Sequence, residues 1–485
     1  MAEGQDQSVD GAEGAEKRRK VALSRRRLLQ VAGGGAIAAV GAAALYEGLA
    51  QVAPHPARNV EAPHGGYPSG QYQVADYGVR VQPDPESAVV VSVPPLWNLV
   101  ITATLTRAPG VHEQSRLEAA LRAVEAAYPY SPAGVFTLVA YGLTYFHSYI
   151  RPPVFEAHLP HMAGTPDAED AKGAPVLVDA VRFPSDPPSM LLEANDIVFQ
   201  LRSDMLDNLL DVQRALFEGS GKLAGRPAPS ANVADLFHVT SKRTGFVGAG
   251  LPRRMAEQAH LKVASLIPDS TPLFMGFTSS QQAGQAKEVA VRFDGQPDPL
   301  VPPLTTARPA DYFAGGTALH LSHLVEDLEA WYALSYEERL ARMFHFNAPA
   351  PTGRVAVQTM WINPNTTELD AQQRGVIGHN EAVQRGSRTR EGQALQLRVD
   401  FNTLDAMDVE DETVAVPGVH FLAFTPGAPI FHRSRLGMDD PNLAAQHGVE
   451  AKANGINAFI RATRRQNFLA PPRAHRAFPL LELQG

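Results

Sequence analysis

The sequence predicts an α+β protein built from two similar modules. Apolar, β-branched runs that suit strands alternate with runs of helical period. This strand–helix–strand pattern occurs over residues 87–141 and returns within residues 317–470. No short internal repeat is present, which excludes a solenoid or a propeller. We therefore expect an N-terminal module over residues 74–245 and a C-terminal module over residues 246–485.

The first half contains three runs of β-branched and apolar residues and one helical run. Leu117, Leu121 and Val124 recur at helical spacing, so they are expected to lie on one buried face. The expected elements are strands at 88–93, 99–105 and 134–141 and a helix at 112–127.

The second half repeats this order of elements. A long helix is indicated by apolar residues at helical spacing that include Leu328, Trp331 and Leu340. The expected elements are strands at 317–324, 419–424 and 466–470 and helices at 324–343 and 455–464.

The N-terminal region is typical of a twin-arginine export signal. Adjacent arginines within residues 24–30 precede a Gly- and Ala-rich apolar run that is too short for a confident membrane span. We predict a disordered n-region and signal over residues 1–50, cleaved after Ala50, and a linker over 51–73. An uncleaved anchor is the alternative. The protein is then exported through the twin-arginine translocase to the periplasm, cell envelope or extracellular space, and folded export favours a bound cofactor.

Composition excludes several classes of function. The chain has a formal net charge of -8 and no basic stripe outside the signal, so nucleic acid is not an expected partner. It has no cysteine, which excludes disulfides and thiolate ligands, and its 16 histidines leave candidates for metal binding. H-E-x-x-H, P-loop and G-x-S-x-G motifs are absent. Residues 245–250 are glycine-rich but do not follow the dinucleotide-binding order.

Several short sequence segments, in the same order along the chain, resemble those of the dye-decolourising peroxidase (DyP-type) superfamily of haem proteins. The chain looks like a divergent member of that superfamily. The segments include a strand followed by an acidic, Trp-containing helix, a strand that lines the haem in the family, and a closing segment that ends at two prolines. The resembling segments are residues 140–146, 315–320, 326–331, 418–424, 456–461 and 467–472.

The resemblance implies two ferredoxin-like modules with antiparallel sheets, of the dimeric α+β barrel type, and haem b in the C-terminal module. His379 matches the family's proximal iron ligand, and Arg398 follows nineteen residues later in the place of the distal arginine. A solvated loop histidine is the alternative for His379. His345 and His432 are the fallback ligands.

Other positions are weaker candidates for the same site. The family's G-x-x-D-G turn carries a proton-moving aspartate, and Gly248 stands in its place here. Asp400 and Asn402 are candidates to substitute for it, or they simply terminate a strand. Phe421 lies on the haem-lining strand, and Arg433 and Arg435 are candidates for the haem propionates, with surface solvation as their alternative role.

The resemblance therefore implies an exported, haem-dependent peroxidase that reduces hydrogen peroxide with an unidentified reducing substrate. Its activity is expected to be weak because Gly248 carries no acid. The alternative is a non-catalytic protein that binds haem or another apolar ligand, or a structural relative with an empty pocket. Self-association into a homo-oligomer stays open.

Overall fold

The computed structural model describes residues 67–485 except 76–79, 84–89, 166–168, 278–284, 297–301, 345–363, 408–414 and 440. The expected export signal and most of the linker lie outside the described residues. Within the described part of the chain, none of the helices combines the length and the apolar character that crossing a membrane requires.

The chain up to residue 258 contributes strands and helices in the expected alternation. The strands are β1 (Arg80–Pro83), β2 (Val90–Val93), β3 (Trp97–Leu105), β4 (Phe136–Tyr141), β5 (Leu191–Leu192), β6 (Ile197–Ser203), β7 (Lys222–Leu223), β8 (Arg226–Pro227) and β9 (Phe237–Phe246). The helices are α4 (Val111–Ala127), α5 (Leu143–Tyr149), α6 (Pro152–His158), α7 (Leu206–Phe217) and α8 (Leu251–Gln258).

The remainder of the chain continues in the same way, with more helices between its first and second long strands. The strands are β10 (Thr317–Glu326), β11 (Leu397–Arg398), β12 (Phe401–Thr403), β13 (Gly418–Thr425) and β14 (Ile460–Ala470). The helices are α9 (Leu328–Tyr332), α10 (Tyr336–Met343), α11 (Pro364–Arg374), α12 (His379–Ser387), α13 (Ala428–Asp439) and α14 (Pro441–Gln446).

The strands form two antiparallel units with one topology. In the first unit the order across the sheet is β9-β3-β6-β4, and in the second it is β14-β10-β13-β12. Numbered along the chain, both read fourth, first, third, second, which is the ferredoxin-like arrangement of a βαββαβ chain. The α+β class and the two ferredoxin-like modules expected from the sequence are confirmed.

The two units join edge to edge and close a barrel-like sheet. Strand β12 pairs with β9 through Asn402 and Phe246, and β14 pairs with β4 through Leu469 and Tyr141. At the first seam the strands approach so closely that a Cβ atom on Gly245 would overlap the carbonyl oxygen of Asn402. Glycine at this position is therefore required for closure.

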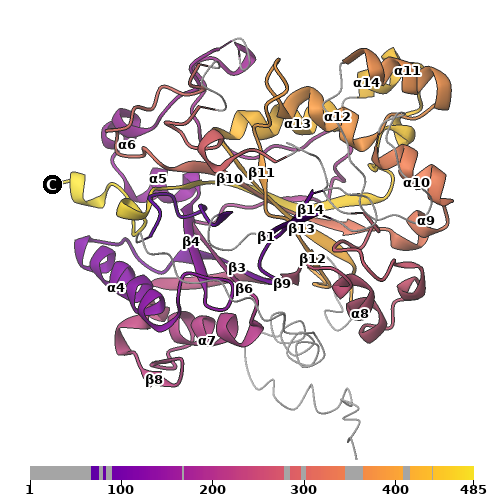
Figure 1. Ribbon diagram of the computed structural model, residues 1–485. Coiled ribbons are helices and arrows are strands. Elements are labelled where there is room, and N and C mark those ends of the chain that lie inside the picture. The colour runs from indigo at the N-terminus through magenta and orange to yellow at the C-terminus, as the bar shows by residue number, and fades with distance from the viewer. Residues whose placement is uncertain are drawn as a thin grey trace, which may run out of the picture.

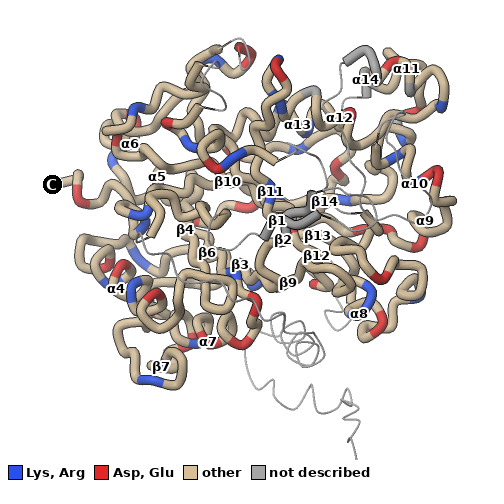
Figure 2. Tube along the Cα trace, in the orientation of Figure 1, with Lys and Arg blue, Asp and Glu red and all other residues tan. Residues whose placement is uncertain are grey.

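Helices cover the outside of this sheet (Figure 1). Helices α4 and α7 lie together against the first unit, and α12 and α13 lie against the second. One apolar cluster takes residues from strands of both units and fills the space that the closed sheet encloses. Figure 2 shows acidic and basic residues interspersed around the periphery of the molecule.

Three local expectations were wrong. Residues 460–464 belong to strand β14 rather than to a helix, because they pair with β10 from Glu326 onward. The expected helix over 324–343 is divided into α9 and α10, since Ser335 caps a new helix. His379 does not lie on a loop but begins helix α12, and residues 431–435 are helical as well, in α13.

Candidate functional site

A cavity lies between strands β10 to β13 and helices α12 and α13. Side chains of Ser322, Leu324 and Glu326 alternate along β10 and so share the face that borders it. Apolar side chains form much of the wall, and polar or charged side chains share it. The apolar lining residues come from the sheet, the helices and the connecting segments, and include Leu273, Met275, Phe277, Met343, Phe344, Val419, Phe431, Met438 and Ile456.

His379 borders this cavity from the first turn of α12. Gly378 precedes the helix, and its N–H donates to the Glu381 carboxylate at 2.9 Å, which fixes the start of the helix. The Nδ1 atom of His379 is buried and has no hydrogen-bond partner among the residues that the structure describes. Burial first, and then the positive charges of Arg398 and Arg435, lower the pKa of His379 to about 3. The imidazole is therefore neutral at physiological pH.

Arg398, the last residue of β11, and Asp400, between β11 and β12, also border the cavity. The backbone N–H of Arg398 donates to Oε1 of Gln285 at 2.8 Å, so this segment is held from a distant part of the chain. His379, Arg398 and Asp400 thus come from separate elements and meet at one cavity.

Asn402 also borders the cavity, but its side chain is engaged in the barrel seam. Its Nδ2 donates to the carbonyl oxygens of Phe246 at 2.9 Å and Pro272 at 2.8 Å, while its Oδ1 accepts from the N–H of Phe274 at 2.9 Å. Both donors are occupied. We therefore assign Asn402 a positioning function at the junction of β12, β9 and residues 272–274.

The predicted haem contacts divide into two groups. Phe421 and Arg435 border the cavity, and Arg435 also donates to Ser185 at 2.9 Å and lies 3.3 Å from the Asp439 carboxylate. Arg433 is not among the cavity residues. It donates from Nε to the carbonyl of Gly386 at 3.0 Å and pairs with Asp170 at 3.6 Å.

The other histidines do not border the cavity in the described part of the chain. His432, on α13, packs against the ring of Phe183, and the two ring centroids are 5.1 Å apart. His320 and His323 are buried on β10, where His320 bonds Asn467 and Ser322, and His323 bonds Thr463. His345 lies outside the described residues.

Gly248 follows β9 and is buried, but it is not among the residues that border the cavity. A Cβ atom at this position would lie 2.7 Å from Leu96 Cδ2 and 3.1 Å from Leu251 Cδ1. A larger side chain here would therefore displace two core leucines.

Glu326 is a cavity residue that the sequence reasoning missed. It is the last residue of β10, its side chain is 8% exposed, and burial first, then the charge of Asp400, raise its pKa to about 8. The strand expected at 317–324 ended two residues too early. Extending its alternation would have placed Glu326 on the same face as Ser322.

These residues fit a haem. A neutral imidazole whose Nδ1 has no hydrogen-bond partner among the described residues is the form that binds iron, and Arg435 is suited to a carboxylate of a porphyrin. The Nη1 atom of Arg435 is itself buried and makes no hydrogen bond with the described part of the chain. Aromatic and aliphatic side chains form much of the remaining wall. Among the described residues no cluster of three or more His, Asp or Glu side chains is placed to hold a metal ion directly.

Solved structures with a similar fold are DyP-type peroxidases. They include the encapsulated DyP-type peroxidase of Mycobacterium smegmatis (14% identity, TM-score 0.48, 82% of this chain and 97% of that one). A variant of Rhodococcus jostii RHA1 DypB in complex with heme has 14% identity, a TM-score of 0.48, and covers 79% of this chain and 96% of its own. A dye-decolorizing protein from V. cholerae has 14% identity, a TM-score of 0.44, and covers 79% and 95%.

No curated protein sequence matches this chain. A family model described as a family of unknown function, DUF7405, matches residues 95–472, which include both ferredoxin-like units and every residue placed at the cavity above. The chain therefore belongs to DUF7405.

Proposed function

We propose that this protein is a haem b protein of the dye-decolourising peroxidase type that reduces hydrogen peroxide. The observation that carries the proposal is the convergence of His379, Arg398 and Asp400 on one cavity of the C-terminal unit. The sequence resemblance supplied His379 and Arg398 by their order and spacing alone. Their meeting at a largely apolar cavity is an independent argument for the same assignment.

Each polar group has a definite task in this proposal. Bound haem would supply the redox-active iron at which peroxide reacts. His379, neutral because it is buried among cationic side chains, would hold the iron from the α12 side. Arg398 would stabilise negative charge that develops on peroxide oxygen. Arg435 would pair with a propionate, and Phe421 would pack against the porphyrin face.

The proposal includes export and partners. Residues 24–30 suit recognition by the twin-arginine translocase, which would deliver the folded protein to the periplasm, cell envelope or extracellular space. The electrons for peroxide reduction would come from a reducing substrate of unspecified chemistry.

We propose that the peroxidase activity is weak because Gly248 stands where the family has a proton-moving aspartate. The second candidate function is haem binding without turnover. Haem binding without turnover is favoured by the glycine at position 248, because this residue packs against Leu96 and Leu251 and carries no acidic side chain.

The first test is the visible absorption spectrum of the full chain supplied with haem. The wild type is expected to show a strong Soret band that sharpens with cyanide, and His379→Ala is expected to lose it because the axial ligand is gone. His432→Ala is the matched control, since His432 lies outside the cavity, and it should keep the band.

Circular dichroism is used to check that the wild type and each variant are folded. A folded, colourless wild-type protein would refute haem binding. A Soret band retained by His379→Ala would refute the assignment of the ligand. Hydrogen peroxide turnover by the haem-loaded protein then separates the peroxidase from the non-catalytic alternative.

A further inference from the structure

Glu326 differs from the other buried acids of this protein. Asp196 accepts from the N–H of Leu105 at 2.8 Å, Asp204 from the N–H of Leu96 at 3.0 Å, and Asp405 from the N–H of Thr244 at 3.0 Å, so each of them has at least one oxygen in a hydrogen bond. The Oε2 atom of Glu326 is buried and accepts no hydrogen bond from the described residues. Such a group is expensive to bury, so it calls for an explanation beyond packing.

The carboxyl group of Glu326 is held in its neutral form. Burial disfavours the carboxylate, the nearby Asp400 adds a like charge, and together they raise the pKa of Glu326 to about 8. The group therefore carries a proton at neutral pH and can release it within the physiological range. Arg398, Arg435, Arg465 and His379 are the other ionisable groups that border the cavity with these two acids.

Few other groups at the cavity can move a proton. Both donors of Asn402 are occupied in the barrel seam, and a guanidinium is a poor proton carrier because it does not lose its proton in proteins. Asp400 is half-buried, whereas Glu326 is enclosed and its Oε2 accepts no hydrogen bond from the described part of the chain. Glu326 is therefore the carboxyl group best shielded from exchange with solvent.

We propose that Glu326 transfers the proton when hydrogen peroxide is cleaved in this cavity, an inference that rests on the proposed function. The carboxylate of Glu326 takes the proton from the near oxygen of peroxide. The resulting acid returns it to the far oxygen, which leaves as water when the O–O bond breaks. Overall, one peroxide, two protons and two electrons from the reducing substrate give two waters, and Glu326 ends in its starting form.

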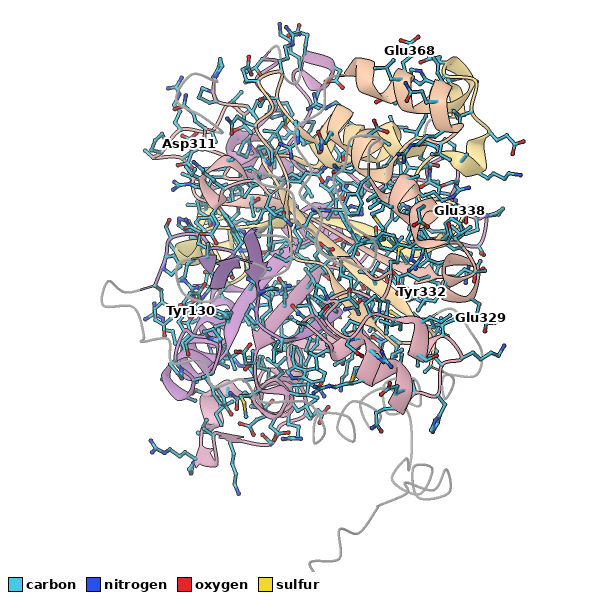
Figure 3. All side chains as sticks on the ribbon, turned by 45° about the vertical axis from the view of Figure 1, so that its right-hand side comes forward. Tyr130, Asp311, Glu329, Tyr332, Glu338 and Glu368 are labelled. Carbon is cyan, nitrogen blue, oxygen red and sulfur yellow. The ribbon has the colours of Figure 1, made fainter. Side chains whose placement is uncertain are left out.

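The first experiment asks whether the acid is protonated, and it needs no haem. Infrared spectra of the haem-free full chain are compared between wild type and Glu326→Gln. The wild type is expected to show an additional band of a protonated carboxyl group at pH 6, which disappears as the pH rises past about 8. Glu329→Gln on α9 is the control, because that side chain is exposed, as Figure 3 shows. Absence of the band in wild type would overturn the proposal.

The second experiment measures the reaction with peroxide by stopped-flow absorption of the haem-loaded proteins. Glu326→Gln is expected to keep the Soret band but to react about 100-fold more slowly, the lower end of what a positioned proton carrier contributes. Glu326→Asp should recover part of the rate, and Glu329→Gln should react like the wild type.

The pH profile separates proton transfer from a structural role. The wild-type rate is expected to rise with pH to a plateau above about pH 8, because the carboxylate form starts the reaction. Glu326→Gln should lack this rise. If Glu326→Gln binds haem and reacts like the wild type, the proposal is overturned while the proposed function stands. If no variant, wild type included, binds haem, the proposed function fails and this inference fails with it.

Discussion

His379 and Glu326 are both ionisable, both border the cavity and both are neutral at physiological pH, for the same physical reason. Burial disfavours the charged form of each, so it lowers the pKa of the histidine and raises the pKa of the acid. The charges that remain at the cavity belong to Asp400 and to the arginines, including Arg398 and Arg435. This combination suits an iron ligand, a proton carrier and a site for carboxylates within one enclosure.

The raised pKa of Glu326 has a consequence for stability that does not depend on haem. Its ordinary value is 4.5 and its folded value is about 8, so the folded state holds one more proton than the unfolded state between these pH values. The stabilisation is complete below pH 4.5 and is lost as the pH rises through 8. The slope is up to about 1.4 kcal/mol per pH unit.

We expect urea denaturation to show this pH dependence when the free energies of unfolding of the wild type and of Glu326→Gln are compared. The free energy of unfolding of the wild type, relative to that of Glu326→Gln, should fall steadily from pH 5 to pH 8. Taking the difference cancels the contributions of the buried histidines, which are common to both proteins. A difference that is independent of pH would contradict a raised pKa.

The residues that border the cavity were predictable in part. His379 and Arg398 were expected together at one site and both border the cavity, because their order and spacing along the chain do not depend on the exact helix and strand bounds, while their roles stay a prediction. Glu326 could not be found in this way, because its importance depends on burial and on the absence of a partner, which only the packed structure reveals. Asn402 was predicted near Arg398 and borders the same cavity, but its hydrogen bonds to β9 and to residues 272–274 follow from the closure of the barrel.

At the scale of elements, the sequence predicts strands better than helix boundaries. Strands β3 and β4 are rich in β-branched and aromatic residues and lie where expected. Residues 455–464 have no decisive pattern of their own, and pairing with β10 makes the second half of this segment a strand. Helices α9 and α10 show the opposite case, because Ser335 is a local signal for a helix start inside the range expected as one helix.

The start of α10 at Ser335 is expected to contribute measurably to the free energy of unfolding. Ser335 Oγ accepts from the N–H of Glu338 at 3.2 Å, and the Glu338 carboxylate accepts from the N–H of Ser335 at 2.8 Å, which is a capping box. Figure 3 shows Glu338 at the outer surface of the molecule. We expect Ser335→Ala to lower the free energy of unfolding by about 1 kcal/mol.

Ser115→Ala is the matched control for this prediction. Ser115 is an exposed serine inside α4 that bonds the Val111 carbonyl within its own helix, so its replacement by alanine should be neutral or slightly stabilising. Urea denaturation of the three proteins provides the comparison. Equal stability of Ser335→Ala and the wild type would show that the box does not stabilise α10 in solution.

At the scale of the whole molecule, the two ferredoxin-like units are held together by more than the strand seams. Each seam is a single residue pair, whereas the segment after β14 returns to the N-terminal unit and makes several bonds there. Tyr141 Oη donates to the carbonyl of Arg476 at 2.8 Å and accepts from the N–H of Phe478 at 2.7 Å. Tyr145 Oη donates to the carbonyl of Pro479 at 3.0 Å. The C-terminal segment therefore fastens one unit to the other.

Arg476 is the charged centre of this attachment. Its side chain is 2% exposed, and its guanidinium binds Glu118 at 3.0 Å and also Glu125, both on α4. Removing the arginine would leave these carboxylates partly buried with less compensation, so we expect Arg476→Ala to lower the free energy of unfolding by about 3 kcal/mol. Arg254→Ala, an exposed position on α8, should change stability by less than about 0.5 kcal/mol. Denaturation of the three haem-free proteins measures both, and a loss below about 1 kcal/mol for Arg476→Ala would mean that the seams and the apolar core alone hold the two units together.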